Sequence, residues 1–164
     1  MRIMMDLAFN ERTALRLLNW LARENAVILR EQPGLPLLYE SGVRYEREVG
    51  EVWSDYLNVL MKGHEDCDAL SAARAGELMA KGWRALQPGD GGYRLARRLR
   101  PRHIYAEVFL RTATPRGRPG LYHCLVTYRV GGRSFEDDPS ARLGMNDTPR
   151  PQLQSADNGQ WVEV

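Results

Sequence analysis

The sequence predicts an α+β fold, in which helices occupy the first half of the chain and a small antiparallel sheet follows them. Apolar residues recur at helical spacing before residue 83, whereas β-branched and aromatic residues alternate in part after residue 102. A Gly-Gly pair at 131–132 separates two segments of the second kind. With 164 residues, of which 43% are hydrophobic and 27% charged, the chain has the composition of one globular domain.

The first expected helix covers residues 10–30. Asn10 is a good N-cap, and the leucines from Leu15 to Leu21 form an apolar stripe that we expect to pack on the rest of the domain. Pro33 and Pro36 then break the chain into an extended linker. We expect three parts: an N-terminal amphipathic helix with its linker at residues 1–36, a core domain at 37–146 and a coil-like tail at 147–164.

A second helix is expected over residues 50–62. The segment before it, residues 37–48, shows no helical period and reads as a loop with short extended pieces. Apolar residues then recur at helical spacing, and Gly63 ends the pattern. Trp53 has this spacing, so it fits a core position as well as the wall of a cleft.

A third helix begins at the acidic residues Glu65 and Asp66. It is rich in alanine, and Gly82 is its expected end. Because Asp66 is a good N-cap, this prediction places Cys67 in the first turn of the helix.

The sheet is expected from three segments in the second half. Residues 103–111 and 122–130 are rich in β-branched and aromatic residues. The Gly131-Gly132 pair is a two-residue hairpin signal, so the next strand begins at Arg133. Helices first and strands second is the order of an α+β domain.

Cys67, His123 and Asp138 are the candidate catalytic residues. A cysteine in the first turn of a helix lies at the positive end of the helix dipole, which favours the thiolate. The hairpin places His123 and Asp138 on or next to adjacent strands, so they can act as a base and the carboxylate that orients it. The same residues also fit a structural interpretation, as a small buried cysteine, a hydrogen-bonded histidine and a turn-forming aspartate.

A metal site is the alternative use of this region. His64, Cys67, His123 and Cys124 are all residue types that bind zinc. However, successive strand residues point to opposite faces, so His123 and Cys124 do not easily bind one ion. We therefore expect no metal and no cofactor, and we expect Cys124 to face away from the site instead of pairing with Cys67.

Arginine dominates the basic residues, because the 23 Lys and Arg include only two lysines, Lys62 and Lys81. Five arginines fall between Arg94 and Arg102. This cluster fits phosphate binding, docking on an acidic protein surface, or simply an exposed loop. A net charge of +2, without a nucleic-acid motif or a Gly-rich phosphate loop, argues against nucleic acid as the partner.

Short sequence motifs around the candidate residues resemble those of the transglutaminase-like superfamily of cysteine enzymes. Asp66-Cys67-Asp68-Ala69-Leu70 resembles the helix start that carries the cysteine in that superfamily. The motifs and their order are similar to those of a group of small transglutaminase-like proteins encoded among bacteriophage structural genes. These motifs are LYESGVRY at 38–45, DCD at 66–68, YH at 122–123, EDDPS at 136–140 and LGM at 143–145.

The resemblance covers roughly two-thirds of the chain and implies a transglutaminase/papain-like core. It implies Cys67 as the nucleophile, His123 as the base and Asp138 as the orienting carboxylate. Asp138 is preferred to Asp137 because the acid of the family directly precedes Pro-Ser.

The surroundings of the cysteine supply candidates for a substrate cleft. These candidates are Tyr45, Trp53, Asp66 and Asp68. The chain departs from the family at Glu65, where glycine is usual, and this change bears on specificity more than on the three chemical positions.

The activity implied by the resemblance is acyl transfer or hydrolysis on a peptide or carboxamide. The expected substrates are proteins or the peptides of peptidoglycan, and the expected partners are virion head or tail proteins. The alternative is a non-catalytic virion structural or assembly protein on the same fold. The sequence shows no secretory leader, and its apolar runs are much shorter than the roughly 20 residues of a membrane helix. We therefore expect the protein to be located in the virion or the host cytoplasm, and not in a membrane.

Overall fold

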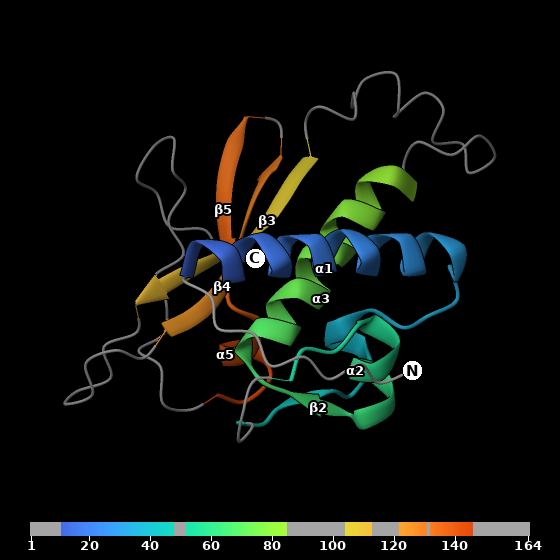
Figure 1. Ribbon diagram of the computed structural model, residues 1–164. Coiled ribbons are helices and arrows are strands. Elements are labelled where there is room, and N and C mark those ends of the chain that lie inside the picture. Colours follow the sequence, from blue (N-terminus) through green and yellow to red (C-terminus); the bar gives the residue numbers. More distant parts are fainter. Residues whose placement is uncertain (1–10, 48–51, 85–103, 113–121, 131, 146–164) are drawn as a thin grey trace.

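The first half of the protein is helical in the computed structural model, which describes residues 11–47, 52–84, 104–112, 122–130 and 132–145 (Figure 1). Its elements are, in chain order, α1 (Glu11–Glu31), the 3-10 turn η1 (Leu38–Glu40), β1 (Arg44–Tyr45), α2 (Tyr56–Lys62), β2 (His64–Glu65) and α3 (Cys67–Arg84). The two short strands β1 and β2 pair in parallel, with Arg44 opposite His64.

The second half forms an antiparallel sheet followed by a short helix. Its elements are β3 (Ile104–Thr112), β4 (Tyr122–Val130), β5 (Arg133–Asp137) and α5 (Pro139–Arg142). The strands lie in the order β3-β4-β5, and Val130 pairs with Arg133 across the predicted hairpin. Gly132 takes a positive φ of 85° there, which glycine adopts without steric cost. The α+β prediction is therefore confirmed.

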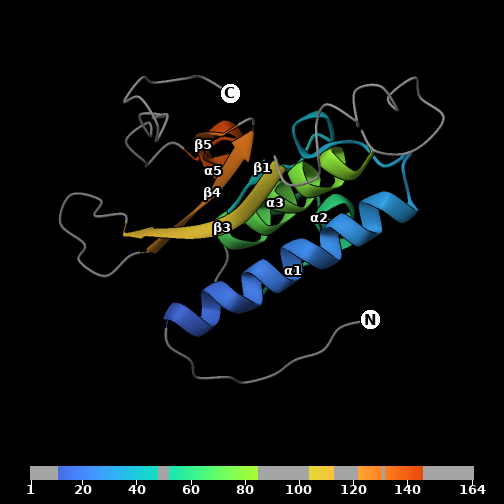
Figure 2. The ribbon, with the colours of Figure 1, turned by 90° about the horizontal axis from the view of Figure 1, so that it is seen from above.

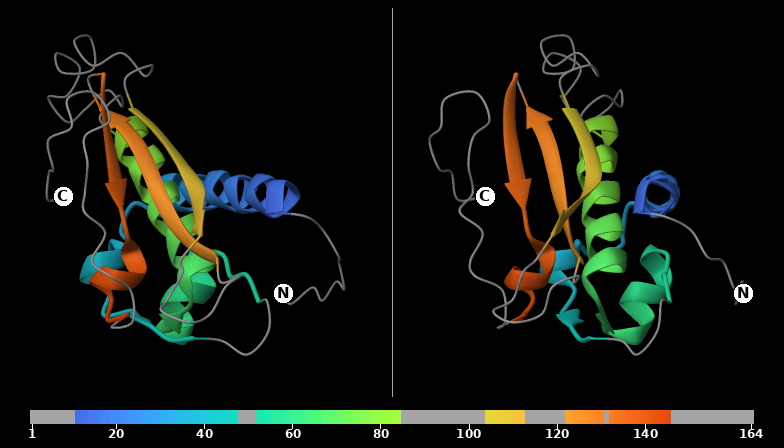
Figure 3. Two further views of the ribbon diagram at one scale, coloured as in Figure 1. Left: turned by 90° about the vertical axis from the view of Figure 1, so that its left-hand side faces the viewer. Right: turned by 60° about the vertical axis from the view of Figure 1, so that its left-hand side comes forward.

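Helix α3 lies in the middle of the fold. It is placed between the three-stranded sheet and α1, as Figures 2 and 3 show. Every residue from Asp68 to Leu78 is buried. A helix that is covered on all sides needs small residues for close packing, and the alanines of α3 provide them.

Two clusters of buried apolar side chains surround α3. The first joins α3 to the sheet and to α1, and its larger members are Leu18, Leu78, Val108, Val126 and Tyr128. The second joins α3 to α1, η1 and α2, and its larger members are Leu29, Leu38, Tyr56, Val59 and Leu70. The apolar stripe of α1 contributes to both clusters, so this helix packs on the domain as its spacing predicts.

Helix α2 is shorter than its apolar spacing predicts. It begins at Tyr56, so Trp53 precedes the helix instead of lying within it. The reason is Asp55, whose side chain accepts a hydrogen bond of 2.9 Å from the backbone N–H of Asn58 and caps the helix there. Gly63 ends α2 with a φ of 74°, as predicted.

Three other boundaries also differ from the sequence predictions. Glu65 lies in β2 and not in the third helix, because its carbonyl accepts a hydrogen bond from Glu46 beside β1. Helix α3 continues through Gly82, since a glycine costs a helix only about 1 kcal/mol, less than tertiary packing provides. Residues Pro139–Arg142 form α5, where no helix was predicted, because Asp138 caps it.

Some sequence predictions concern residues outside the described ranges. These are the cap at Asn10, the arginines of the Arg94–Arg102 cluster, Gly131 and the tail at 147–164. Among the helices that are described, none combines the length and the apolar character needed to cross a membrane.

Helices α1 and α3 come into close contact at Gly76. A Cβ atom at this position would lie 2.6 Å from the Cβ of Asn25 and 2.9 Å from the backbone oxygen of Ala22. Asn25 is itself fully buried and accepts a hydrogen bond of 2.8 Å from the backbone N–H of Tyr56. It therefore has little freedom to move away, and the missing side chain at Gly76 sets the spacing of the two helices.

We expect Gly76→Ala to lower the free energy of unfolding by about 1–3 kcal/mol, the usual cost of over-packing. The added methyl group has to push α1 away from α3, which outweighs the higher helix propensity of alanine. Urea denaturation measures the change. Gly34→Ala is the matched control, because nothing lies within 4 Å of a Cβ atom there. Equal losses in the two variants would contradict the close contact.

Candidate active site

Cys67 is the first residue of α3, and it is half-buried. The backbone carbonyl of Asp66 accepts a hydrogen bond of 3.1 Å from the N–H of Leu70, which places Asp66 at the N-cap. The predicted position of Cys67 in the first turn is therefore confirmed. At this end of a helix, the dipole and the N–H groups without intrahelical partners favour a negative charge on the sulfur.

His123 lies in β4, and Asp138 directly follows β5. The Nε2 atom of His123 is 2.8 Å from Oδ2 of Asp138, and both side chains are buried. The second carboxylate oxygen, Oδ1, accepts a hydrogen bond of 3.0 Å from the N–H of Ala141 and so caps α5. Because both oxygens of Asp138 are held, the carboxylate fixes the orientation of the His123 ring.

Cys67 lies on the other side of His123. The two side chains influence each other's protonation: His123 helps to lower the pKa of Cys67, and Cys67 helps to raise the pKa of His123. The Nδ1 atom of His123 is buried and has no hydrogen-bond partner among the described residues. The structure thus brings the three residues predicted from the sequence into one region, with His123 in direct contact with Asp138 and Cys67 beside them.

The contacts of Cys67 favour its thiolate form. A hydrogen bond with the thiol of Cys124, supported by contacts with His123 and the Cys124 backbone, outweighs burial and lowers the pKa of Cys67 to about 5. Burial disfavours the charged form of His123, but hydrogen bonds with Asp138 and Cys67 outweigh it and raise the pKa of His123 to about 9. Between these two values the pair is a thiolate and an imidazolium.

Cys124 overturns one prediction. It lies in the core as predicted, but Cys67 packs against the same core cluster and Cys124 lowers the pKa of the Cys67 thiol, so Cys124 does not turn away from the site. Strand alternation does direct His123 and Cys124 to opposite faces. Cys67, however, also packs against the core cluster that contains Cys124, and both His123 and Cys124 influence its pKa. Hydrogen bonding with Cys67 and burial raise the pKa of Cys124, which stays a thiol.

Asp66 and Asp68 flank the cysteine. Burial and a hydrogen bond with Asp66 raise the pKa of Asp68 to about 10. The Oδ1 atom of Asp68 accepts a hydrogen bond of 2.6 Å from the N–H of Ala69. Asp68 is therefore neutral at physiological pH, and it adds no negative charge beside the thiolate of Cys67.

The two aromatic cleft candidates lie in different places. Trp53 is partly buried and packs against the same core cluster as Cys67, so it stays a candidate for the wall of a cleft. Tyr45 lies in β1 and packs against the second core cluster, and its N–H donates a hydrogen bond of 2.9 Å to the carbonyl of Leu143. The structure therefore places Tyr45 with the core residues.

The alternative metal ligands are not assembled. The Nδ1 atom of His64 lies 3.6 Å from a carboxylate oxygen of Glu46. Within the described part of the chain, no three or more His, Cys, Asp and Glu side chains are grouped so that they could hold a metal ion.

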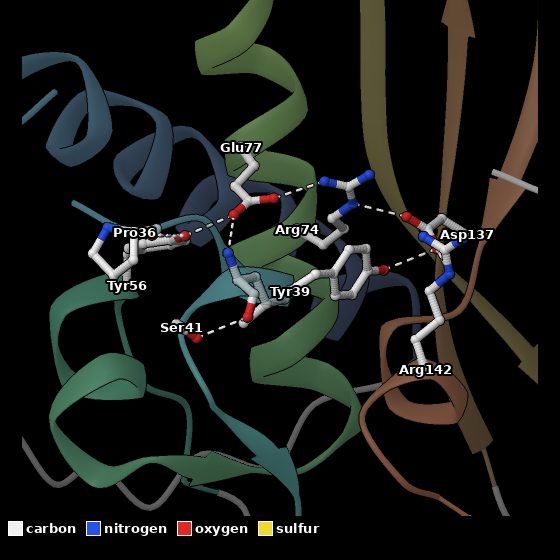
Figure 4. Close-up of polar contacts among 9 residues, drawn as sticks. Pro36, Tyr39, Ser41, Tyr56, Arg74, Glu77, Asp137 and Arg142 are labelled. Carbon is white, nitrogen blue, oxygen red and sulfur yellow. Dashed lines mark hydrogen bonds and ion pairs between the residues drawn. The ribbon is translucent and has the colours of Figure 1, made fainter. Parts of the chain in front are cut away.

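A second buried polar group centres on Arg74, about two turns after Cys67 on α3. Its Nε donates to Oδ2 of Asp137 and its NH1 donates to Oε2 of Glu77, each at 2.7 Å (Figure 4). The hydroxyl of Tyr39 donates to the other oxygen of Asp137 at 2.9 Å. These contacts join η1, α3 and the end of β5.

Glu77 extends this group to the second core cluster. Its Oε1 atom accepts a hydrogen bond of 2.7 Å from the hydroxyl of Tyr56 and another from the N–H of Leu38 (Figure 4). Both oxygens of Glu77 are thus paired, as a fully buried carboxylate requires.

The Arg74 group and the candidate site share two elements. Cys67 and Arg74 are seven residues apart on α3 and so lie on about the same face of the helix. Asp137 and Asp138 are consecutive at the end of β5, so Arg74 holds the strand end from which Asp138 reaches His123. This role of Arg74 was not predicted from the sequence. The sequence feature that could have indicated this role is a charged residue within a predicted helix that is rich in alanine.

Comparisons of the chain with protein-family models, with curated proteins and with solved structures found no match. The positions of Cys67, His123 and Asp138 in the structure are therefore the basis for assigning them a function, and the transglutaminase-like resemblance stays a prediction.

We expect Arg74→Met to lower the free energy of unfolding by about 3–5 kcal/mol, because it leaves Asp137 and Glu77 buried without their cation. Urea denaturation measures this loss. Arg142→Met is the control, since Arg142 lies 3.8 Å from Asp137 and is 38% exposed, so it contributes at most about 1 kcal/mol. Similar losses in the two variants would show that Arg74 has no special structural role.

Proposed function

We propose that this protein is a cysteine-dependent acyl-transfer enzyme with Cys67 as its nucleophile, His123 as its general base and acid, and Asp138 as the carboxylate that orients the ring. The observation that carries the proposal is the buried contact of 2.8 Å between His123 and Asp138, beside a cysteine at the N-terminus of α3. The imidazole, whose Nε2 is held by a buried carboxylate, favours the thiolate of this cysteine. This arrangement activates a thiol before any substrate is bound.

The proposed reaction begins with attack of the Cys67 thiolate on the carbonyl carbon of a peptide or carboxamide. A C–S bond forms, and the backbone N–H of Cys67 at the helix start is the donor that we assign to the developing oxyanion. His123 then protonates the leaving amine, which departs and leaves a thioester on Cys67. Water or a substrate amine, deprotonated by His123, takes the acyl group and releases the thiolate.

We place this activity in the transglutaminase-like superfamily, close to its small bacteriophage members. What supports the assignment is the order of the elements, with cysteine at the start of α3, histidine in β4 and aspartate after β5. This is the order that the resemblance implies. Proteins or peptidoglycan peptides are the proposed substrates, and virion head or tail proteins are the proposed partners.

Alkylation with iodoacetamide tests the ion pair. We expect Cys67 to react at a nearly constant rate between about pH 6 and pH 8, since its pKa lies at about 5 and that of His123 at about 9. An ordinary thiol, with a pKa of about 8.5, reacts almost tenfold faster with each pH unit over this range. Peptide mass spectrometry follows Cys67 and Cys124 separately, and Cys124 is expected to react slowly because it is buried.

Asp138→Asn is the matched variant for this experiment. Asparagine still caps α5, but it removes the negative charge beside His123, so the pKa of His123 falls and alkylation of Cys67 becomes pH-dependent. Equal, slow labelling of both cysteines in the unmodified protein would contradict the enzyme and leave the non-catalytic assembly protein as the function.

Acylation with 4-nitrophenyl acetate tests the covalent step. We expect a burst of nitrophenolate equal to the amount of protein, and an acetyl group on Cys67 in the mass spectrum. His123→Gln is expected to slow the burst by about 10²-fold or more, as loss of a general base does. Absence of a burst from a protein whose Cys67 is reactive toward iodoacetamide would contradict acyl transfer.

A further inference from the structure

Cys124 is a buried nucleophile that the proposed mechanism leaves unused. Cys67 packs against the core cluster that contains Cys124, at the interface of α3 and β4, and each thiol shifts the pKa of the other. Both cysteines are free, and they are the only two in the chain. Two free thiols that pack in one cluster are the starting point for a disulfide, which joins cysteines whose Cα atoms come within about 7 Å of each other.

Cys67 is the member of this pair that an oxidant meets first. It is half-buried, whereas Cys124 is only 3% exposed. The helix N-terminus and His123 favour its thiolate, which is the form that attacks peroxides. The two cysteines therefore differ in both access and charge, as an attacking and a resolving thiol do.

We propose that Cys67 and Cys124 form a reversible disulfide when a peroxide oxidises the protein, with Cys124 as the resolving thiol. The thiolate of Cys67 attacks one oxygen of hydrogen peroxide, and the O–O bond breaks. Cys67 becomes a sulfenic acid, and the departing hydroxide takes the proton held by the His123 imidazolium and becomes water. The sulfur of Cys124 then attacks this sulfur, the S–S bond forms, and water leaves. In total the two thiols lose two electrons and two protons, and the peroxide becomes two molecules of water.

The first step prepares the second. The interaction with Cys67 and burial raise the pKa of Cys124, so the neighbouring thiolate keeps Cys124 in its thiol form. A sulfenic acid is neutral, so oxidation of Cys67 removes the charge that opposes ionisation of Cys124. The resolving thiol is therefore activated only after Cys67 has been oxidised.

Formation of the disulfide is reversible, because a dithiol reduces it and regenerates the thiol of Cys67. Without a resolving partner, further peroxide converts a sulfenic acid to sulfinic and sulfonic acids, which thiols do not reduce. The pair thus protects the proposed nucleophile and switches it off while oxidant is present. This inference depends on the proposed function only for the thiolate of Cys67, and the disulfide forms whether or not the protein turns over a substrate.

The test treats the reduced full-length protein with a small molar excess of hydrogen peroxide at neutral pH and then with N-ethylmaleimide. We expect a monomer that has lost two hydrogen atoms, takes up no maleimide and yields a cross-linked peptide pair containing Cys67 and Cys124. Dithiothreitol is expected to restore both thiols. A Cys67 that instead gains two or three oxygen atoms, while Cys124 still takes up maleimide, would overturn the proposal.

Cys124→Ala is the matched variant, because alanine suits the apolar surroundings and removes only the resolving thiol. At the same dose we expect at least about tenfold more sulfinic and sulfonic acid on Cys67 than in the unmodified protein. Equal over-oxidation would overturn the proposal, and Cys124→Ser gives the same comparison if the alanine variant does not fold. A disulfide in a protein that 4-nitrophenyl acetate does not acylate would contradict acyl transfer alone.

Discussion

The burial of α3 on every side is the constraint on which the rest of the structure depends. Between Asp68 and Leu78 the charged side chains of this helix have almost no access to water, so they need partners inside the protein. Arg74 pairs with Asp137 and Glu77, and Glu77 also accepts hydrogen bonds from Tyr56 and Leu38. These partners belong to η1, α2 and β5, so one buried ionic group connects the helical half of the chain to the sheet.

This constraint also positions the candidate site. Arg74 holds Asp137 at the end of β5, and the next residue, Asp138, caps α5 and contacts His123. Cys67 begins the helix that carries Arg74. The positions of the proposed nucleophile and of the carboxylate of Asp138 therefore both depend on α3, although the two residues are far apart in the sequence.

The thiolate of Cys67 is stabilised by hydrogen bonds as well as by the charge of one neighbour. The thiol and the backbone of Cys124 contribute, in addition to His123, and the carboxyl group of Asp68 is neutral. This explains how a sulfur with two aspartates beside it still favours the ionised form. The same packing places the resolving thiol of the proposed disulfide in the core cluster against which the proposed nucleophile packs.

The sequence by itself determined the features that depend on neighbours along the chain. Helical spacing identified α1 and α3, alternation and the glycine pair identified β4 and the β4–β5 hairpin, and a capping residue placed Cys67 in the first turn of α3. Asp55 shows the limit of this reasoning, because its cap shortened α2 against the apolar spacing. The order of cysteine, histidine and aspartate was likewise readable, since a hairpin makes consecutive strands neighbours.

Only the tertiary structure decided which side chains meet across elements. Arg74 and Asp137 are 63 residues apart in the chain, and no local pattern relates them. Alternation along β4 predicted the face of Cys124 correctly, but not that Cys67 reaches that face as well. A strand specifies the direction of its own side chains. The distance to the start of a helix is set by how that helix packs on the sheet, and this depends on all the residues of the interface together.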